Sequence, residues 1–172
     1  MKIQVITILL IFTLFSCSTT SEPQLISIND IYQIEVPADM SPTDINDEAS
    51  LQYANLFKEK YLMIIHEDKN EFTEFVKPIE VDKVIEKFTD LVVQGYEQSF
   101  NNEAYVYDIS FNGLIGKKVE IDGVFEDIPI AWHAVLIEGE ENLYQICFWT
   151  LKSRENKHME QLFNSAKTFN EL

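Results

Sequence analysis

The order of apolar and polar residues divides the chain into segments that alternate, as strands do, and segments with helical spacing. Alternation predicts strands over residues 31–36, 51–57, 61–66, 105–111, 114–124, 128–138 and 143–152. Residues 81–100 repeat their apolar side chains every three or four positions, which predicts an amphipathic helix. A second helix is predicted after a Ser153 cap, with an apolar stripe of Met159, Leu162, Phe163, Ala166 and Phe169.

The turns and the last two strands indicate how these segments are arranged. Residues 51–57 and 61–66 fit a hairpin, and Asn112-Gly113 predicts another, because both residue types tolerate a positive φ. The strands at 128–138 and 143–152 are apolar on both faces, so both faces must be covered. We therefore expect an α+β fold: a three-layer α/β/α sandwich with a mostly antiparallel central sheet and one main helix on each face.

The register of the last two strands decides whether Cys147 and His133 can form a nucleophile–base pair. A four-residue loop, 139–142, places Cys147 opposite Ala134 and His133 opposite Phe148, on the other side of the sheet. An odd-length loop or a bulge would reverse this result. We predict that both side chains pack in the core.

The same register places Trp132 directly opposite Trp149. A cross-strand aromatic pair of this kind contributes about 0.5–1 kcal/mol to stability and is usually structural. It becomes a binding surface only where a helix leaves it uncovered.

The first residues of the chain have the features of an export signal. Lys2 precedes an apolar run of 13 residues, 3–15, which spans about 20 Å as a helix against about 30 Å of hydrocarbon, so a membrane-spanning anchor is disfavoured. Leu14-Phe15-Ser16-Cys17 resembles a bacterial lipobox, whose cysteine is acylated and becomes the first mature residue. We expect a signal peptide at 1–16, a lipidated Cys17 with a polar tether at 17–30, and a single domain at 31–172.

The net charge of the chain and its expected place at a membrane limit the binding partners that it can have. The chain has 13 Lys and Arg against 29 Asp and Glu, a net charge of −16, which excludes nucleic acid and favours basic partners or divalent cations. Solubility alone also explains such a charge. We expect two binding partners: the membrane, through the acylated Cys17, and an unknown protein that is basic on its contact surface. Ser18 is not the Asp that retains some lipoproteins at the inner membrane, so a cell with two membranes would place the protein at the outer one.

Few residues suggest catalysis or metal binding. No Gly-x-Ser-x-Gly elbow occurs, and no zinc-ligand spacing occurs around His66 or His158. Two acidic loops could hold Ca²⁺, although neither has the EF-hand pattern, and neither has the aromatic platform that a glycoside-cleaving pair of carboxylates would need nearby. We expect no cofactor, no metal and no enzyme activity. The loop acids are Asp39, Asp44, Asp47 and Glu48 in one loop, and Asp122, Glu126 and Asp127 in the other.

The order of elements resembles the PsbP-like α/β/α sandwich proteins. This group includes an extrinsic subunit of photosystem II, a nuclear-import factor that binds the GTPase Ran, and many small bacterial lipoproteins. The resemblance implies a non-enzymatic binding or assembly role and names no partner, because fold analogy alone does not transfer a function. The residues that carry it are 32–37, the paired strands 51–57 and 61–67, 111–113, 144–150 and 164–169.

We therefore expect a lipid-anchored cell-envelope protein with a non-enzymatic binding or accessory role. The alternative is a protein that binds a small molecule or a divalent cation, through an acidic loop or a cleft at the sheet edge.

Overall fold

The computed structural model describes residues 22–78, 80 and 83–172. The predicted signal peptide at 1–16 and the predicted lipidation site Cys17 lie outside these residues. The helices are α1 (Lys69–Phe75), α2 (Val84–Phe100) and α3 (Glu155–Ala166), with a 3₁₀ turn, η2 (Lys152–Arg154). The strands are β1 (Gln24–Ile28), β2 (Tyr32–Val36), β3 (Ser41–Pro42), β4 (Leu51–Asn55), β5 (Lys60–Asp68), β6 (Tyr105–Phe111), β7 (Leu114–Phe125), β8 (Ile128–Glu138), β9 (Asn142–Leu151) and β10 (Asn170–Glu171).

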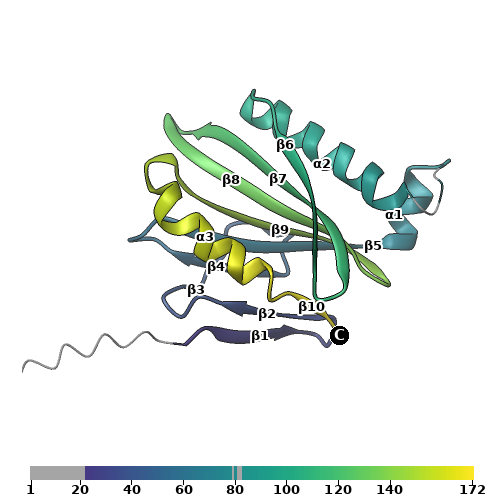
Figure 1. The fold of residues 1–172 in the computed structure, drawn as a ribbon, viewed down its shortest axis with the longest axis horizontal. Helices are drawn as coiled ribbons and strands as arrows, with labels where there is room; N and C mark the ends of the chain where they lie inside the picture. Colours follow the sequence, from purple (N-terminus) through teal and green to yellow (C-terminus); the bar gives the residue numbers. More distant parts are fainter. Residues whose placement is uncertain (1–21, 79, 81–82) are drawn as a thin grey trace, which may run out of the picture.

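A seven-stranded antiparallel sheet forms the centre of the fold, in the order β3-β4-β5-β9-β8-β7-β6 (Figure 1). The predicted β4–β5 and β6–β7 hairpins are confirmed, and Asn112 and Gly113 have φ values of 51° and 81° in the second turn. The register of β8 and β9 is also as predicted: Trp132 pairs with Trp149, and Ala134 pairs with Cys147.

Each face of this sheet carries its own apolar core. Helices α1 and α2 cover one face, and α3 covers the other, so the three-layer arrangement is as expected (Figure 1). The core under α2 is built on Met63, Phe72, Val84, Ile85, Phe88, Val119, Ala134, Leu136, Leu143 and Cys147. The core under α3 includes Tyr32, Ile34, Leu62, Ile64, Val135, Ile146, Phe148, Met159, Leu162 and Phe169.

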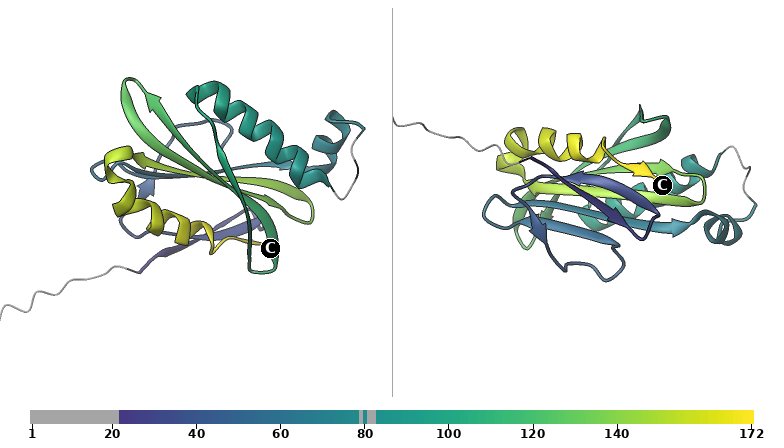
Figure 2. Two further views of the ribbon diagram at one scale, coloured as in Figure 1. Left: turned by 45° about the horizontal axis from the view of Figure 1, so that its top comes forward. Right: turned by 90° about the horizontal axis from the view of Figure 1, so that it is seen from below.

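A second sheet, in the order β1-β2-β10, lies beside α3 on the same face of the central sheet (Figure 2). The sequence placed residues 24–28 in a polar tether, but they form β1, which pairs with β2 from Gln24↔Val36 to Ile28↔Tyr32. Partly buried Ile26 and Ile28 pack against the core, which explains why this segment is a strand. The ordered domain therefore begins before the predicted start at residue 31.

The helices differ from the sequence prediction at their ends. Helix α1 was not predicted, and it begins where the Asp68 carboxylate accepts hydrogen bonds from the backbone N–H groups of Asn70 and Glu71, at 2.8 and 2.9 Å. The predicted cap Ser153 does not cap α3, because it lies inside η2 and the helix begins after Arg154. Helix α2 is described from Val84, and positions 81–82 of the predicted helix are outside the described residues. Within the described ranges, no helix combines the length and the apolar character needed to cross a bilayer.

Candidate functional site: an aromatic cleft beside the end of α2

Three aromatic side chains form a ladder across three neighbouring strands on the α2 face of the sheet. The Tyr61 ring of β5 stacks on Trp149 of β9, with ring centroids 4.9 Å apart and an interplanar angle of 6°. Trp149 in turn stacks on Trp132 of β8, at 4.5 Å and 20°. Directly paired positions on one face of a sheet bring their side chains together, so the strand register alone produces this ladder.

Helix α2 covers only one end of the ladder. Its last two aromatic residues, Tyr96 and Phe100, pack on Trp132, with ring centroids 5.7 and 5.6 Å away. The Phe100 ring lies over β7 at Gly123, where it fills the space that a Cβ atom would need. The helix therefore ends above β7 and β8 and does not extend over Trp149.

The uncovered part of the ladder is the floor of a cleft of about 900 Å³. We call this the aromatic cleft: Tyr61 and Trp149 form its floor, and Trp132 lines it at the end that α2 covers. Exposed apolar side chains form its rim, and they come from the 43–48 loop, the β4–β5 turn and the β7–β8 turn: Ile45, Leu56, Phe125 and Ile128. Carboxylates stand among them: Asp47, Glu48, Glu59 and Glu126. Aromatic residues thus lie beside these loop acids, contrary to the sequence-based expectation.

The Tyr61 hydroxyl is held at the edge of the cleft as a neutral hydrogen-bond donor. It donates to Glu59 Oε2 at 2.7 Å. Burial and the Glu59 carboxylate together raise the pKa of Tyr61 to about 12. This side of the cleft therefore presents an uncharged ring and a carboxylate, a combination that attracts cations and N–H donors.

Cys147 lies on the same face as the ladder, but it is sealed beneath α2. Its Sγ is 3.1 Å from the Tyr96 hydroxyl and 3.3 Å from Gln145 Nε2. Burial raises the pKa of Cys147 to about 11, so the thiol is protonated and unreactive at neutral pH. As the sequence predicted, this cysteine is a core residue.

His133 projects from the other face of the sheet, opposite Phe148, as predicted. Its Nδ1 is 3.9 Å from Glu120 Oε1 and its Nε2 is 3.8 Å from Glu155 Oε1. Burial lowers the pKa of His133 and outweighs the two carboxylates, which act in the opposite direction. Because the sheet separates His133 from Cys147, the two cannot act as a nucleophile and its base.

The candidate metal ligands are dispersed. Asp39 is paired with Lys58 and Lys60, and Asp122 Oδ1 accepts a hydrogen bond from Lys152 Nζ at 2.7 Å. His66 Nδ1 lies 3.0 Å from the Ser50 hydroxyl, and His158 is a buried residue of α3. Among the residues that the structure describes, no group of three or more His, Cys, Asp or Glu side chains is placed to hold a metal ion.

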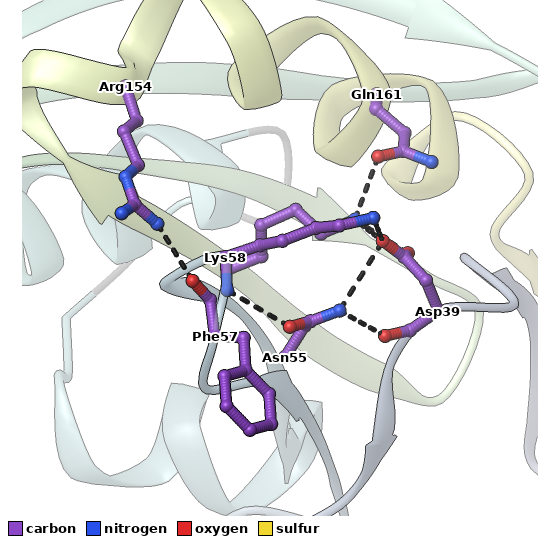
Figure 3. Close-up of polar contacts among 7 residues, drawn as sticks. Asp39, Asn55, Phe57, Lys58, Arg154 and Gln161 are labelled. Carbon is purple, nitrogen blue, oxygen red and sulfur yellow. Dashed lines mark hydrogen bonds and ion pairs between the residues drawn. The ribbon is translucent and has the colours of Figure 1, made fainter.

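A polar cluster around the buried Lys60 side chain braces the β4–β5 turn beside the cleft (Figure 3). Lys60 is only 1% exposed, and its Nζ contacts Asp39 Oδ1 at 2.6 Å and Gln161 Oε1 of α3 at 2.9 Å. Lys58 Nζ binds the same carboxylate at 2.7 Å, and Asn55 Nδ2 donates to the Asp39 carbonyl. We call these five residues the Asp39–Lys60 cluster; it fixes the turn against α3.

The sequence identified part of this site and missed the rest. The strand pattern predicted that Trp132 pairs with Trp149, and we expected this pair to bind a ligand only where a helix leaves it uncovered. It did not connect Tyr61, because the neighbour of β9 on its other side could not be known before the strand order was known. It also treated Asp39 as a loop acid, although a Lys in a strand that is otherwise apolar on its inner face was a signal for a buried partner.

The chain resembles known proteins in its fold. No family model matches the sequence, and no curated protein matches it. Among solved structures, the chain is similar to cyanobacterial PsbP (CyanoP) from Synechocystis sp. PCC 6803, with a TM-score of 0.62 and 15% identity over 92% of this chain and 99% of that one. The chain has a PsbP-like fold. This confirms the fold that the order of elements suggested.

Two further structures share this fold with less of the sequence. LpqN of Mycobacterium tuberculosis, involved in cell envelope biogenesis, gives a TM-score of 0.56 at 12% identity over 81% of this chain and 82% of that one. A protein of Bacteroides thetaiotaomicron gives 0.58 at 8% identity over 89% of this chain, which corresponds to 49% of that longer chain. At these identities the likeness establishes the PsbP-like fold alone, and the function has to be inferred from the geometry of the site.

Proposed function

We propose that this chain is a lipid-anchored cell-envelope protein with a non-enzymatic accessory role, and that it binds a partner protein through the aromatic cleft. The uncovered Tyr61–Trp149 part of the ladder is the observation that carries this proposal. A soluble domain of this size can bury such rings, and here a seventeen-residue helix stops before it reaches them. Exposed apolar surface of this kind, rimmed by polar residues, is typical of binding sites.

The chemistry of the cleft indicates what the partner presents. The floor offers flat aromatic rings, and the rim combines apolar side chains with carboxylates. Lys and Arg side chains suit both features, because their cations are attracted to ring faces and to carboxylates. We therefore expect a partner segment that carries basic and apolar side chains, in keeping with the net charge of −16.

The anchor would serve this role by holding the domain at the membrane surface, at high local concentration beside its partner. Cys17 is the proposed acylated residue. One acyl chain binds a membrane reversibly, whereas the several chains of a bacterial lipoprotein make release slow. Replacing Cys17 by Ser should abolish fatty-acid labelling and leave an uncleaved precursor, and unchanged labelling would refute the anchor. The LpqN neighbour, described as involved in envelope biogenesis, supports an envelope location.

Site-specific photo-crosslinking in intact cells tests the binding role. A photoreactive residue in place of Ile45, on the cleft rim and outside the β4–β5 and β7–β8 turns, should yield a discrete protein adduct, and Trp149→Ala in the same protein should remove it. The matched control is Ile115, which is exposed and apolar but remote from the cleft. An adduct of the same mass from both positions, or one unaffected by Trp149→Ala, would rule out the cleft as the binding site.

A small molecule is the second candidate, and the size of the cleft favours it. Its volume of about 900 Å³ lies within the range of about 300–1,000 Å³ that is usual for small-molecule sites. An aromatic cation such as benzyltrimethylammonium is a suitable probe, because it matches the rings and the carboxylates. It should raise the melting temperature of the wild type and leave that of Trp149→Ala unchanged. Equal shifts for both proteins would exclude the cleft as its site.

A further inference from the structure

One end of the central sheet exposes large apolar side chains on two neighbouring turns. Phe57, in the β4–β5 turn, is 96% exposed, and Phe125, at the end of β7, is 63% exposed. Leu56, Val124 and Ile128 beside them are exposed too. We call these five residues the apolar tips. The strand register places both turns at the same end of the sheet, because Lys60, Thr150 and Ala131 are paired in sequence across β5, β9 and β8.

The β4–β5 tip is held in place. Arg154 Nη1 donates to the Phe57 carbonyl at 3.0 Å, and Asn55 Oδ1 accepts from the Lys58 backbone N–H at 3.0 Å. Figure 3 shows the Phe57 ring pointing away from the Asp39–Lys60 cluster that braces the turn. An exposed aromatic side chain on a braced turn needs little ordering when it enters another medium, so most of its transfer free energy is available for binding.

The N-terminal end of the domain lies at this same end of the sheet. Gln24, the first residue of β1, pairs with Val36, and the chain then reaches Asp39, which contacts Lys58 in the β4–β5 turn. Figures 1 and 2 agree, since β1 begins on the side where β4 turns into β5 and β7 turns into β8. Cys17 precedes Gln24 by seven positions, and so short a segment spans at most about 25 Å even when fully extended.

We propose that the apolar tips enter the membrane interface and that the domain stands on the bilayer with this end of the sheet facing it. The inference rests on the proposed acylation of Cys17, which limits this end to within about 25 Å of the surface. Aromatic and aliphatic side chains at that level gain free energy by leaving water for the interface. The mouth of the aromatic cleft, which Leu56, Phe125 and Ile128 line, would then open toward the bilayer.

The charges on the tips indicate which lipid surface fits. Glu59, Glu126 and Asp127 lie in or next to the two turns. Of the nearby cations, Lys58 is paired with Asp39 and Arg154 is bound to the Phe57 carbonyl, so carboxylates outnumber cations at the tips. Carboxylates are repelled by the negative surface potential of anionic lipids. The tips should therefore dock on zwitterionic lipid and dock less on a bilayer rich in phosphatidylglycerol, the reverse of the usual behaviour of peripheral proteins with basic patches.

Depth-dependent fluorescence quenching tests this orientation with the full, lipidated protein in phosphatidylcholine vesicles. An environment-sensitive maleimide dye is attached to Phe57→Cys, or to Phe75→Cys at the far end of the sheet, where the native Phe is 86% exposed. Cys147 is fully buried and does not compete for the dye. Lipids brominated along the acyl chain should quench the dye at position 57 and spare the dye at position 75.

Each result decides the matter. Two results together support the proposal: quenching at position 57 that falls when phosphatidylglycerol is added, and a docking constant that falls about tenfold when Phe125→Ser is introduced. Protein that floats with the vesicles while positions 57 and 75 are quenched equally overturns the orientation and leaves the anchor standing. Protein that carries no acyl group and does not float overturns the anchor, and the orientation falls with it.

Discussion

The Asp39–Lys60 ion pair allows a sharp test of how this fold is held together. The pair joins the loop after β2 to β5 and, through Gln161, to α3. Replacing Asp39 by Asn leaves the Lys60 ammonium buried, at 1% exposure, with only neutral oxygens around it. Breaking a buried pair from one side costs about 3–5 kcal/mol, and we expect about 3 kcal/mol here, because Asp39 is 27% exposed.

Removing the charge from the other side should cost less. Lys60→Met keeps the stem and removes the ammonium, while Asp39 retains Lys58 Nζ at 2.7 Å. We expect a loss of about 1 kcal/mol, and about the same for the double variant, since neither leaves a buried unpaired charge. The coupling free energy between the two sites should therefore have a magnitude of about 3 kcal/mol in a double-mutant cycle.

Urea unfolding measures all four proteins, with Asp44→Asn as the control. Asp44 is an exposed acid in the same acidic segment, so its substitution should change stability by less than about 0.5 kcal/mol. With a slope of about 1–3 kcal/mol/M, a 3 kcal/mol loss moves the midpoint by about 1–3 M. If the Asp39 and Lys60 effects simply add, or if Asp39→Asn matches Asp44→Asn, the buried pair does not act as described.

The pH dependence gives an independent check of the same cluster. Burial acts to raise the pKa of Asp39, but the hydrogen bonds and charges of Lys58 and Lys60 bring it below its usual value. A carboxyl with a lowered pKa in the folded state binds fewer protons than in the unfolded state, so it stabilises the protein above about pH 4 and ceases to do so as the pH falls. The stability difference between wild type and Asp39→Asn should therefore shrink below pH 4, and a constant difference would contradict the charge-based explanation.

Three further predictions concern the α2 face and the core. Gly123→Ala places a methyl group where the Phe100 ring lies, so it should destabilise the domain by about 1–3 kcal/mol in urea unfolding and open the covered end of the aromatic cleft; a neutral result would show that Phe100 moves freely. Cys147 has a pKa raised to about 11, so the folded state keeps its proton longer and stability should fall above about pH 9; Cys147→Ala should flatten that alkaline decline, and an identical decline would argue against it. His133 has a lowered pKa, so the unfolded state binds the proton first and stability should fall below about pH 6.5; His133→Gln should reduce this acid slope in thermal melts, and an unchanged slope would assign it to other groups.

The fold could be predicted from the sequence wherever a local pattern decided the structure. The alternation in 128–138 and 143–152, together with an even loop, determined the β8–β9 register, and Asn112-Gly113 determined a hairpin. Segments whose structure depends on distant partners were missed. Residues 24–28 form β1 only because β2 offers a free edge, and β10 is two residues long, too short to show any pattern.

The candidate site followed the same division. Trp132 and Trp149 are neighbours through a short hairpin, so their contact was accessible from the sequence. Tyr61 joins them through its pairing with Trp149, which lies 88 positions further along the chain, and no local pattern specifies that pairing. The length of α2 could be predicted from its apolar periodicity. The direction of its axis over the sheet, which decides which rings it covers, depends on contacts such as Phe100 on Gly123, and the periodicity does not specify these.

The small β1-β2-β10 sheet would have a consequence for the export that we propose. Asn170 and Glu171 pair with Gln33 and Tyr32, and the Leu172 N–H donates to the Ile31 carbonyl at 2.9 Å. The earliest and latest parts of the domain are thus stitched into one sheet, which cannot close until residue 171 has left the ribosome. Until then the nascent polypeptide lacks the strand that pairs with Tyr32, and it could still pass through a secretion channel that accepts only unfolded chains.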